Sequence, residues 1–355
     1  MASRNDLRIG TSGWSYPTGE GTWNGIFYPP HPKSTRAGKG KFDELAYYAE
    51  RFDTVEINST FYRTPAVNVT KSWAARTPKD FEFSLKLYQK FTHPKMFKEA
   101  ALKRAPGAEG RALEELATIH KSDVDEFKRA MDPLADAGKL GALLAQFPPS
   151  FKADTRSLDY LNWLLHEFKD YRVAVELRHK TWSDELDTTL KLLNGAKAAF
   201  VQIDEPKFRV SIRQNFLPNV KGFYYMRLHG RNAKEWWKHA KSEDRYNYLY
   251  SAEELDEFAG VADAVRTLVK KMYLYTNNHF AGKAVANAVM LKERLGLPVE
   301  GDYPDEFLER YPETRGIVRP ASEAAASEAA APEEAVAPVK AKAKSRRGPR
   351  SPSLF

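Results

Sequence analysis

Cysteine is absent from the 355 residues of this sequence. Its absence excludes disulfide bridges, cysteine-ligated zinc, iron–sulfur clusters and a thiol nucleophile. An oxidising compartment is not excluded, but nothing in the composition requires one. Any catalysis is confined to carboxylate, histidine, lysine, arginine and amide groups.

Long hydrophobic runs are also missing. No apolar stretch approaches the ~20 residues that a membrane-spanning helix needs, and the mean hydropathy is −0.58. The first ten residues, MASRNDLRIG, lack the apolar core of a signal peptide. We therefore expect a soluble, cytoplasmic protein with no membrane partner.

The common nucleotide-binding fingerprints are missing as well. No G-x-G-x-x-G follows the first predicted strand, and no G-x-x-x-x-G-K-[ST] occurs in the chain. What is present is a hydrophobic fraction of 42%, which is enough for a packed core. The chain is also long enough for one large α/β barrel of ~250 residues.

The C-terminal residues differ in composition from the rest. From Pro320 the chain is dominated by Ala, Pro, Glu, Ser and Lys, so it cannot bury enough apolar surface to order itself. We predict a barrel domain over residues 1–319 and a disordered tail over 320–355. The formal net charge is +8, of which the tail carries a net +2, with its acidic residues first and its basic residues at the end. That end could contact nucleic acid, or the tail could serve only solubility.

Apolar, β-branched runs alternate with amphipathic helical stretches through most of the chain. The predicted strands are Leu7–Trp14, Thr54–Tyr62, Glu82–Tyr88, Leu140–Phe147, Arg172–His179, Ala198–Asp204, Phe223–Gly230 and Lys271–Asn278. Between them lie helix signals, including an N-cap at Ser183 and a capping box formed by Ser251 and Glu254. Eight strand–helix repeats predict a (β/α)8 TIM barrel, and the alternative is an open doubly wound sheet.

Polar residues recur on one face of the predicted strands. Side chains alternate between the two faces of a strand, and helices cover the outside of a barrel. We therefore expect the apolar face of each strand to meet the helices and the polar face to point inward. The rule predicts an inward set of Glu56, Asn58, Lys86, Gln146, Glu176, Arg178, Asp204, Arg227 and His229. Asn277 or Asn278 joins it, depending on whether Tyr273 and Tyr275 point inward.

Such a charged cluster favours a ligand site, because buried charges are costly unless they are paired. The candidate catalytic residues are Glu56, Glu176, Asp204 and His229, with the carboxylates as general acid and base. The candidate anion clamp is Lys86, Arg178 and Arg227. Further substrate contacts are expected from Asn58, Gln146, Asn277, Asn278 and, at the end of the first strand, Trp14.

A metal site is the weaker reading of the same residues. The candidate catalytic residues could hold a divalent ion, but the three cations would already neutralise the carboxylates. No H-E-x-x-H spacing supports a metal either, so we assign no metal ligand and leave the cofactor open. Glu56 and Glu176 could instead form a glycosidase pair, which depends on their separation.

Residues 231–250, RNAKEWWKHAKSEDRYNYLY, follow the seventh predicted strand. In a barrel this segment lies at the C-terminal face, where barrel enzymes place their sites. Its aromatic and basic side chains could stack on bases or sugars at the barrel mouth, or they could only hold a long loop in place.

Several long motifs identify a family. They are IGTSGWSY at Ile9–Tyr16, VEINSTFYRTP at Val55–Pro65, FSLKLYQKFTH at Phe83–His93, LLAQFPPSF at Leu143–Phe151, VAVELRHKTW at Val173–Trp182, YYMRLHGR at Tyr224–Arg231 and YLYTNNHFAGKAVANA at Tyr273–Ala288. Over about residues 6–300 the chain resembles the YecE-like domain-of-unknown-function family of TIM-barrel proteins. The resemblance implies a barrel with a shared pocket, whose residues are Glu56, Lys86, Glu176, Arg178, Arg227 and Asn278. It implies no activity.

The leading hypothesis is an enzyme that acts on a small anionic substrate, phosphorylated or not, by carboxylate acid/base chemistry. The residues leave open whether it is a hydrolase, a lyase or an isomerase. One alternative is a nucleic-acid-binding or nuclease-like barrel, suggested by the basic composition and tail. A second alternative is a non-catalytic protein that binds a metabolite.

Overall fold

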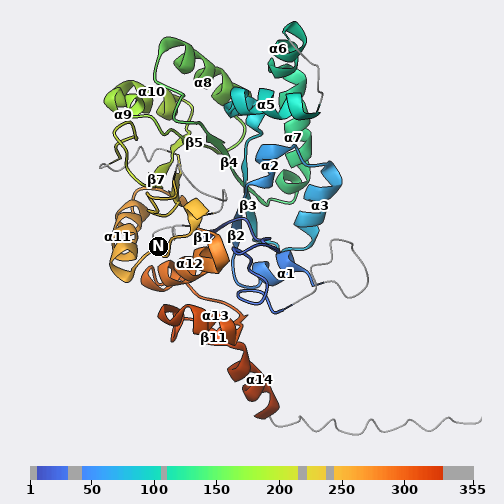
Figure 1. The fold of residues 1–355 in the computed structure, drawn as a ribbon, viewed down its shortest axis with the longest axis vertical. Helices are drawn as coiled ribbons and strands as arrows, with labels where there is room; N and C mark the ends of the chain where they lie inside the picture. Colours follow the sequence, from blue (N-terminus) through green and yellow to red (C-terminus); the bar gives the residue numbers. More distant parts are fainter. Residues whose placement is uncertain (1–5, 31–41, 105–109, 215–221, 237–243, 331–355) are drawn as a thin grey trace, which may run out of the picture.

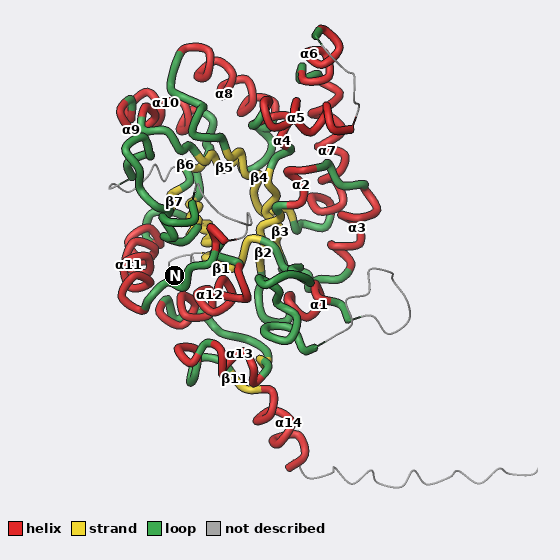
Figure 2. The backbone as a smooth tube through the Cα atoms, in the orientation of Figure 1, coloured by secondary structure: helices red, strands yellow, loops and turns green. Residues whose placement is uncertain are grey.

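The computed structural model describes residues 6–30, 42–104, 110–214, 222–236 and 244–330. Nine parallel strands form one sheet, and helices surround it (Figures 1 and 2). The strands are β1 Asp6–Ser12, β2 Thr54–Ile57, β3 Glu82–Lys86, β4 Leu140–Gln146, β5 Val173–Glu176, β6 Ala199–Phe200, β7 Gln202–Asp204, β8 Tyr224–Leu228 and β9 Lys271–Thr276. Their order is β6-β5-β4-β3-β2-β1-β9-β8-β7.

The two ends of this sheet belong to one stretch of chain. β6 pairs with β5 and β7 pairs with β8, and only Val201 separates β6 from β7. The backbone N–H of Val201 donates to Val175 at 3.0 Å. At the break, the Gln214 side chain accepts from the Ile203 N–H at 2.9 Å and donates to the Val201 carbonyl at 2.7 Å. The predicted sixth strand therefore closes the barrel, and the TIM-barrel prediction is confirmed.

The helices match the predicted pattern between the strands. They are α1 Glu44–Ala49, α2 Ser59–Tyr62, α3 Val67–Ala75, α4 Gln89–Thr92, α5 Pro94–Arg104, α6 Arg111–Ala117, α7 Lys121–Asp136, α8 Thr155–Glu167, α9 Thr181–Asp184, α10 Leu186–Gly195, α11 Ala252–Arg266 and α12 Lys283–Arg294. Short 3₁₀ turns lie at η1 Asp244–Tyr246, η2 Phe280–Gly282 and η3 Pro312–Thr314. None of the helices in the described ranges has the length and apolar character needed to span a bilayer.

Helix ends test two local predictions. The capping box is present, because Ser251 accepts from the Glu254 N–H while Glu254 accepts from the Ser251 N–H. The predicted N-cap at Ser183 is wrong. Ser183 lies inside the short helix α9, where its hydroxyl donates to the Lys180 carbonyl at 2.7 Å. The second predicted strand is also too long, since residues 59–62 turn into helix α2.

The segment after residue 300 begins with ordered structure. A two-stranded sheet of β10 Asp302–Tyr303 and β11 Arg319–Pro320 flanks α13 Asp305–Arg310, and α14 Ala321–Ala330 follows (Figure 1). The prediction of disorder from residue 320 therefore does not hold for α14. Alanine has the highest helix propensity, and the Ser322 hydroxyl donates to Asp305 at 2.8 Å. The basic end of the predicted tail lies outside the described residues.

Candidate functional site

Arg227 lies at the centre of the charged cluster inside the barrel. Its Nη2 donates to Glu56 Oε1 at 2.6 Å, and its Nη1 donates to Glu176 Oε2 at 2.5 Å. β8, β2 and β5 carry these three residues, and none is more than 1% exposed. Buried charges are tolerated only when they are paired and hydrogen-bonded. The alternation of side chains along β8 points Arg227 inward, between the carboxylates that β2 and β5 carry.

Both carboxylate oxygens of Glu56 accept hydrogen bonds. Besides Arg227, its Oε1 accepts from the Ser12 hydroxyl at 2.6 Å, and its Oε2 accepts from the Tyr225 hydroxyl at 2.6 Å. Neither Tyr225 nor Ser12 is among the site residues predicted from the sequence. The signal for Ser12 was its place on β1, two residues after Gly10, on the face that meets the barrel interior.

Arg178 extends the network from Glu176. Its Nε donates to Glu176 Oε1 at 2.7 Å, and its Nη2 forms an ion pair with the same oxygen at 2.6 Å. Burial alone would raise the pKa of Glu176, but Arg227 and Arg178 hold that pKa well below its ordinary value. Glu176 is therefore ionised throughout the neutral range and does not serve as a proton donor there.

Glu205 is the third carboxylate of the cluster. Its Oε2 lies 3.1 Å from Arg178 Nη1, an ion pair without hydrogen-bond alignment, and its side chain is only 5% exposed. Burial raises the pKa of Glu205 in spite of Arg178. A buried carboxyl with a raised pKa keeps its proton to a higher pH than an exposed glutamate does.

His229 lies between the two guanidinium groups. Its Nε2 is 3.3 Å from Arg227 Nη1 and 3.3 Å from Arg178 Nη2, and its Nδ1 is 2.8 Å from the Asn277 amide. Burial and Arg227 together lower the pKa of His229 to about 3. Guanidinium groups only donate hydrogen bonds, so the neutral imidazole accepts from them and His229 orients the arginines.

Lys86 is the cation of the cluster that has no carboxylate partner. Within the described ranges no carboxylate oxygen comes within ion-pair distance of its Nζ, which lies 4.0 Å from the centroid of the Phe61 ring. Thr60 holds the end of β3 by donating its hydroxyl to the Lys86 carbonyl at 2.6 Å. Burial, followed by the charge of Arg227, lowers the pKa of Lys86 to about 7.

Two predicted amides lie near the same strand ends. Gln146 is in register with Glu176 between β4 and β5, so it shares the inward face, and it is half-buried. Asn58 directly precedes α2, and its Oδ1 is buried without a hydrogen-bond partner in the described residues. Gln146 is thus on the inward face with Glu176, and Asn58 lies at the end of the neighbouring strand pair β2 and β3.

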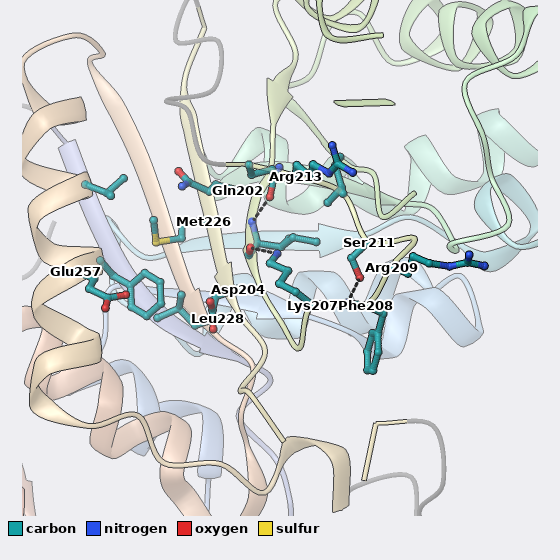
Figure 3. A pocket seen from close by; sticks show the side chains of 15 residues that line it. Gln202, Asp204, Lys207, Phe208, Arg209, Ser211, Arg213, Met226, Leu228 and Glu257 are labelled. Atoms are coloured by element: carbon teal, nitrogen blue, oxygen red, sulfur yellow. Dashed lines mark hydrogen bonds between the residues drawn. The ribbon is translucent and has the colours of Figure 1, made fainter. Parts of the chain in front are cut away.

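Asp204 does not join the cluster, and its predicted inward position is wrong. It is in register with Leu228, so it faces the outside of the barrel. There it accepts from Arg231 Nε at 3.0 Å and from the Tyr250 hydroxyl at 2.7 Å. Figure 3 shows Asp204 among the residues of an outer groove of about 710 Å³, next to Leu228. Ile203, in register with Arg227, takes the inward position instead.

The end of β9 resolves the choice between Asn277 and Asn278. The Tyr275 hydroxyl reaches Thr54 Oγ1 at 2.6 Å inside the barrel, so Asn277, two residues later, also points inward and meets His229. Asn278 turns to the other side, where its Nδ2 donates to Asn287 Oδ1 of α12 at 2.7 Å. Asn278 is thus a packing residue of the wall rather than part of the cluster.

Trp14 and the aromatic segment lie toward the barrel mouth. Trp14 packs edge-on against Trp73 of α3, with ring centroids 5.6 Å apart, which directs it to the outer layer. Trp236 lies 6.4 Å from the His229 ring, and part of the segment, residues 237–243, is outside the described residues. Among the described residues, no three His, Asp or Glu side chains are grouped to hold a metal ion.

Comparisons with known proteins identify the family of this chain. Residues 8–309 match the family model described as "Protein of unknown function DUF72". The chain belongs to the DUF72 family. This DUF72 protein is 26% identical over 313 residues to the UPF0759 protein YunF of Bacillus subtilis strain 168, which covers 85% of this chain and 99% of YunF. It is 31% identical over 150 residues to the UPF0759 protein YecE of Escherichia coli K12, covering 42% of this chain and 45% of YecE. The YecE-like resemblance is confirmed.

Solved structures agree on the fold. A DUF72 family protein from Thermotoga maritima MSB8 superposes with a TM-score of 0.65 at 31% identity, covering 82% of this chain and 99% of that one. A DUF72 family protein from Enterococcus faecalis V583 gives a TM-score of 0.64 at 22% identity, covering 83% of this chain and 99% of that one. The second match shows the fold alone.

Proposed function

We propose that this DUF72 protein is an enzyme that acts on a small anionic substrate at the C-terminal end of its barrel. The observation that carries the proposal is the unpartnered amine of Lys86 beside the Arg178–Glu176–Arg227 network. In the described residues both guanidinium groups are held by glutamates, whereas Lys86 has no acceptor. A substrate anion would supply that acceptor.

The roles of the charged groups in this proposal differ from those predicted from the sequence. The Arg178 side chain is 14% exposed and Arg227 only 1%, so Arg178 contacts the substrate and Arg227 fixes the carboxylates. Glu56 is fully occupied and Glu176 is held ionised, so neither is free for proton transfer. Lys86, with a pKa of about 7, and Glu205, with a raised pKa, are the groups poised to accept and donate a proton.

A metabolite screen tests this assignment. The full chain is incubated with phosphorylated sugars, hydroxy acids and keto acids, and conversion is followed by NMR, in parallel with the Lys86→Met and Glu205→Gln variants. Conversion of an anionic compound that both variants slow at least about 100-fold is the expected result. Tight binding without conversion would assign a non-catalytic metabolite-binding role instead. Conversion that both variants leave unchanged would refute the assignment.

A further inference from the structure

We propose that Lys86 is a nucleophile that forms a Schiff base, and that the substrate is a small carbonyl compound carrying an anionic group. This inference rests on the proposed function and specifies its substrate class. An amine attacks a carbonyl carbon only through its neutral form and only if its lone pair is not engaged elsewhere. The buried lysines of the chain show how Lys86 differs in both respects.

Four lysines of the described residues are buried, and each has an oxygen acceptor. Lys90 donates to Asp123 at 2.8 Å, and Lys271 donates to Glu82 at 2.8 Å. Lys139 donates to the Ala74 carbonyl at 2.6 Å, and Lys292 to the Arg51 carbonyl at 3.2 Å. These contacts stabilise the ammonium form. Lys86 has the Phe61 ring on one side and no oxygen acceptor in this part of the structure.

The charges around Lys86 favour its neutral form. Burial is the largest influence. Arg227 on β8 and Arg178, just after β5, also oppose protonation, while Glu176 and Glu56 favour it. The net result is a pKa of about 7. At pH 7 about half of the Lys86 amine is neutral, compared with about 0.04% for an ordinary lysine. A neighbouring cation and desolvation by burial are the usual means by which proteins activate a lysine nucleophile.

The surrounding polar groups match the reaction. The nitrogen lone pair forms a C–N bond, the carbonyl π electrons move to oxygen, and a proton transfer gives a carbinolamine. The hydroxyl then leaves with the second amine proton as water, and the C=N bond forms. Overall, the amine and the carbonyl compound give an imine and one water molecule. Asn58 directly follows β2, which pairs with β3, the strand that ends at Lys86. Its buried Oδ1 has no partner in the described residues and can accept from the carbinolamine hydroxyl. Arg178 offers a cation for the anionic group.

The test is reductive trapping with a defined probe. The full chain is treated at pH 7 with limiting glyoxylate, an aldehyde carrying a carboxylate, and sodium cyanoborohydride, and modified lysines are mapped by mass spectrometry. We expect Lys86 to be alkylated at least about tenfold faster than the exposed Lys71. Glycolaldehyde, which lacks the anion, should keep only the part of that selectivity that comes from the neutral amine. Lys86→Arg should abolish the selective adduct and leave Lys71 unchanged.

The outcomes separate this inference from the proposed function. If Lys86 is alkylated no faster than Lys71, the Schiff-base role is refuted, whatever the stability of the variant. Sulfate binding is measured in the same preparation by calorimetry. Sulfate binding that depends on Lys86 without selective trapping would leave the anion site standing and remove only the nucleophile. Selective trapping by glyoxylate and glycolaldehyde alike would keep the nucleophile and remove the anionic requirement.

Discussion

Arg227 donates from both Nε and Nη2 to one oxygen of Glu56, at 3.2 and 2.6 Å, inside a barrel where neither side chain reaches solvent. The remaining nitrogen, Nη1, is engaged by Glu176. One guanidinium therefore neutralises carboxylates that arrive from two distant strands. The barrel interior at this level is held by charge rather than by apolar packing.

Removing that guanidinium should be costly. Arg227→Met leaves Glu56 and Glu176 buried with fewer compensating donors, so we expect a loss of about 3–5 kcal/mol in the free energy of unfolding, measured by urea titration. Arg231→Met is the matched control, because Arg231 also pairs with carboxylates but is 32% exposed. Its loss should be about 1 kcal/mol or less. Equal losses would contradict a charge-dependent interior.

Anion binding should depend on pH through Lys86. The anion binds the ammonium form, and the pKa of that group is lowered to about 7. Sulfate affinity should therefore be at its maximum at pH 6, where Lys86 is protonated, and should fall by up to about tenfold per pH unit above pH 7. Calorimetry at pH 6, 7 and 8 measures it, and sulfate keeps one charge state over this range. Lys86→Arg should bind sulfate with little pH dependence, since arginine stays protonated. A wild-type affinity that is flat from pH 6 to 8 would exclude Lys86 as the anion contact.

The same lysine should reduce stability in a pH-dependent way. The folded pKa of Lys86 lies below the unfolded value of 10.5, so the unfolded chain binds more protons between pH 7 and 10.5. The penalty is complete below pH 7 and disappears as the pH rises toward 10.5. Lys86→Met should therefore be more stable than the wild type at pH 6, by on the order of 1–2 kcal/mol given the partial exposure of the lysine. The difference should shrink by pH 9, as measured by urea unfolding at both values.

Strand alternation predicted the inward faces of β2, β3, β5 and β8, because the outward positions there are uniformly apolar. The rule failed at the sixth strand. Val201 and Ile203 fill the interior, as barrel cores require, while Asp204 is satisfied outside by Arg231 and Tyr250. Polarity alone does not tell an interior apolar residue from an exterior one.

Other features depend on contacts that no local pattern encodes. The sequence predicts Lys86 among the inward cations. It does not show that Lys86 lacks a carboxylate partner, which follows because Arg178 and Arg227 take up the nearby glutamate. Glu205 lies two residues after Ile203 and shares its inward face. The rule that apolar residues face outward placed Ile203 on the outside, so it did not predict Glu205 in the site. At the C-terminus, helix α14 forms in a segment that buries little, since alanine favours a helix without core contacts.

Glu205 and Asp204 give the sharpest test of the revised site, because they are adjacent in sequence and lie on opposite sides of the barrel wall. Glu205→Gln removes a negative charge 3.1 Å from Arg178, so sulfate affinity at pH 7 should rise by about 3–10-fold. Asp204→Asn removes a carboxylate that holds Arg231 on the outer face, so it should lower the free energy of unfolding by about 1 kcal/mol and leave sulfate affinity unchanged within about twofold. Calorimetry and urea unfolding on both variants measure the two effects. The opposite pattern, with affinity changed by Asp204→Asn and not by Glu205→Gln, would return Asp204 to the site.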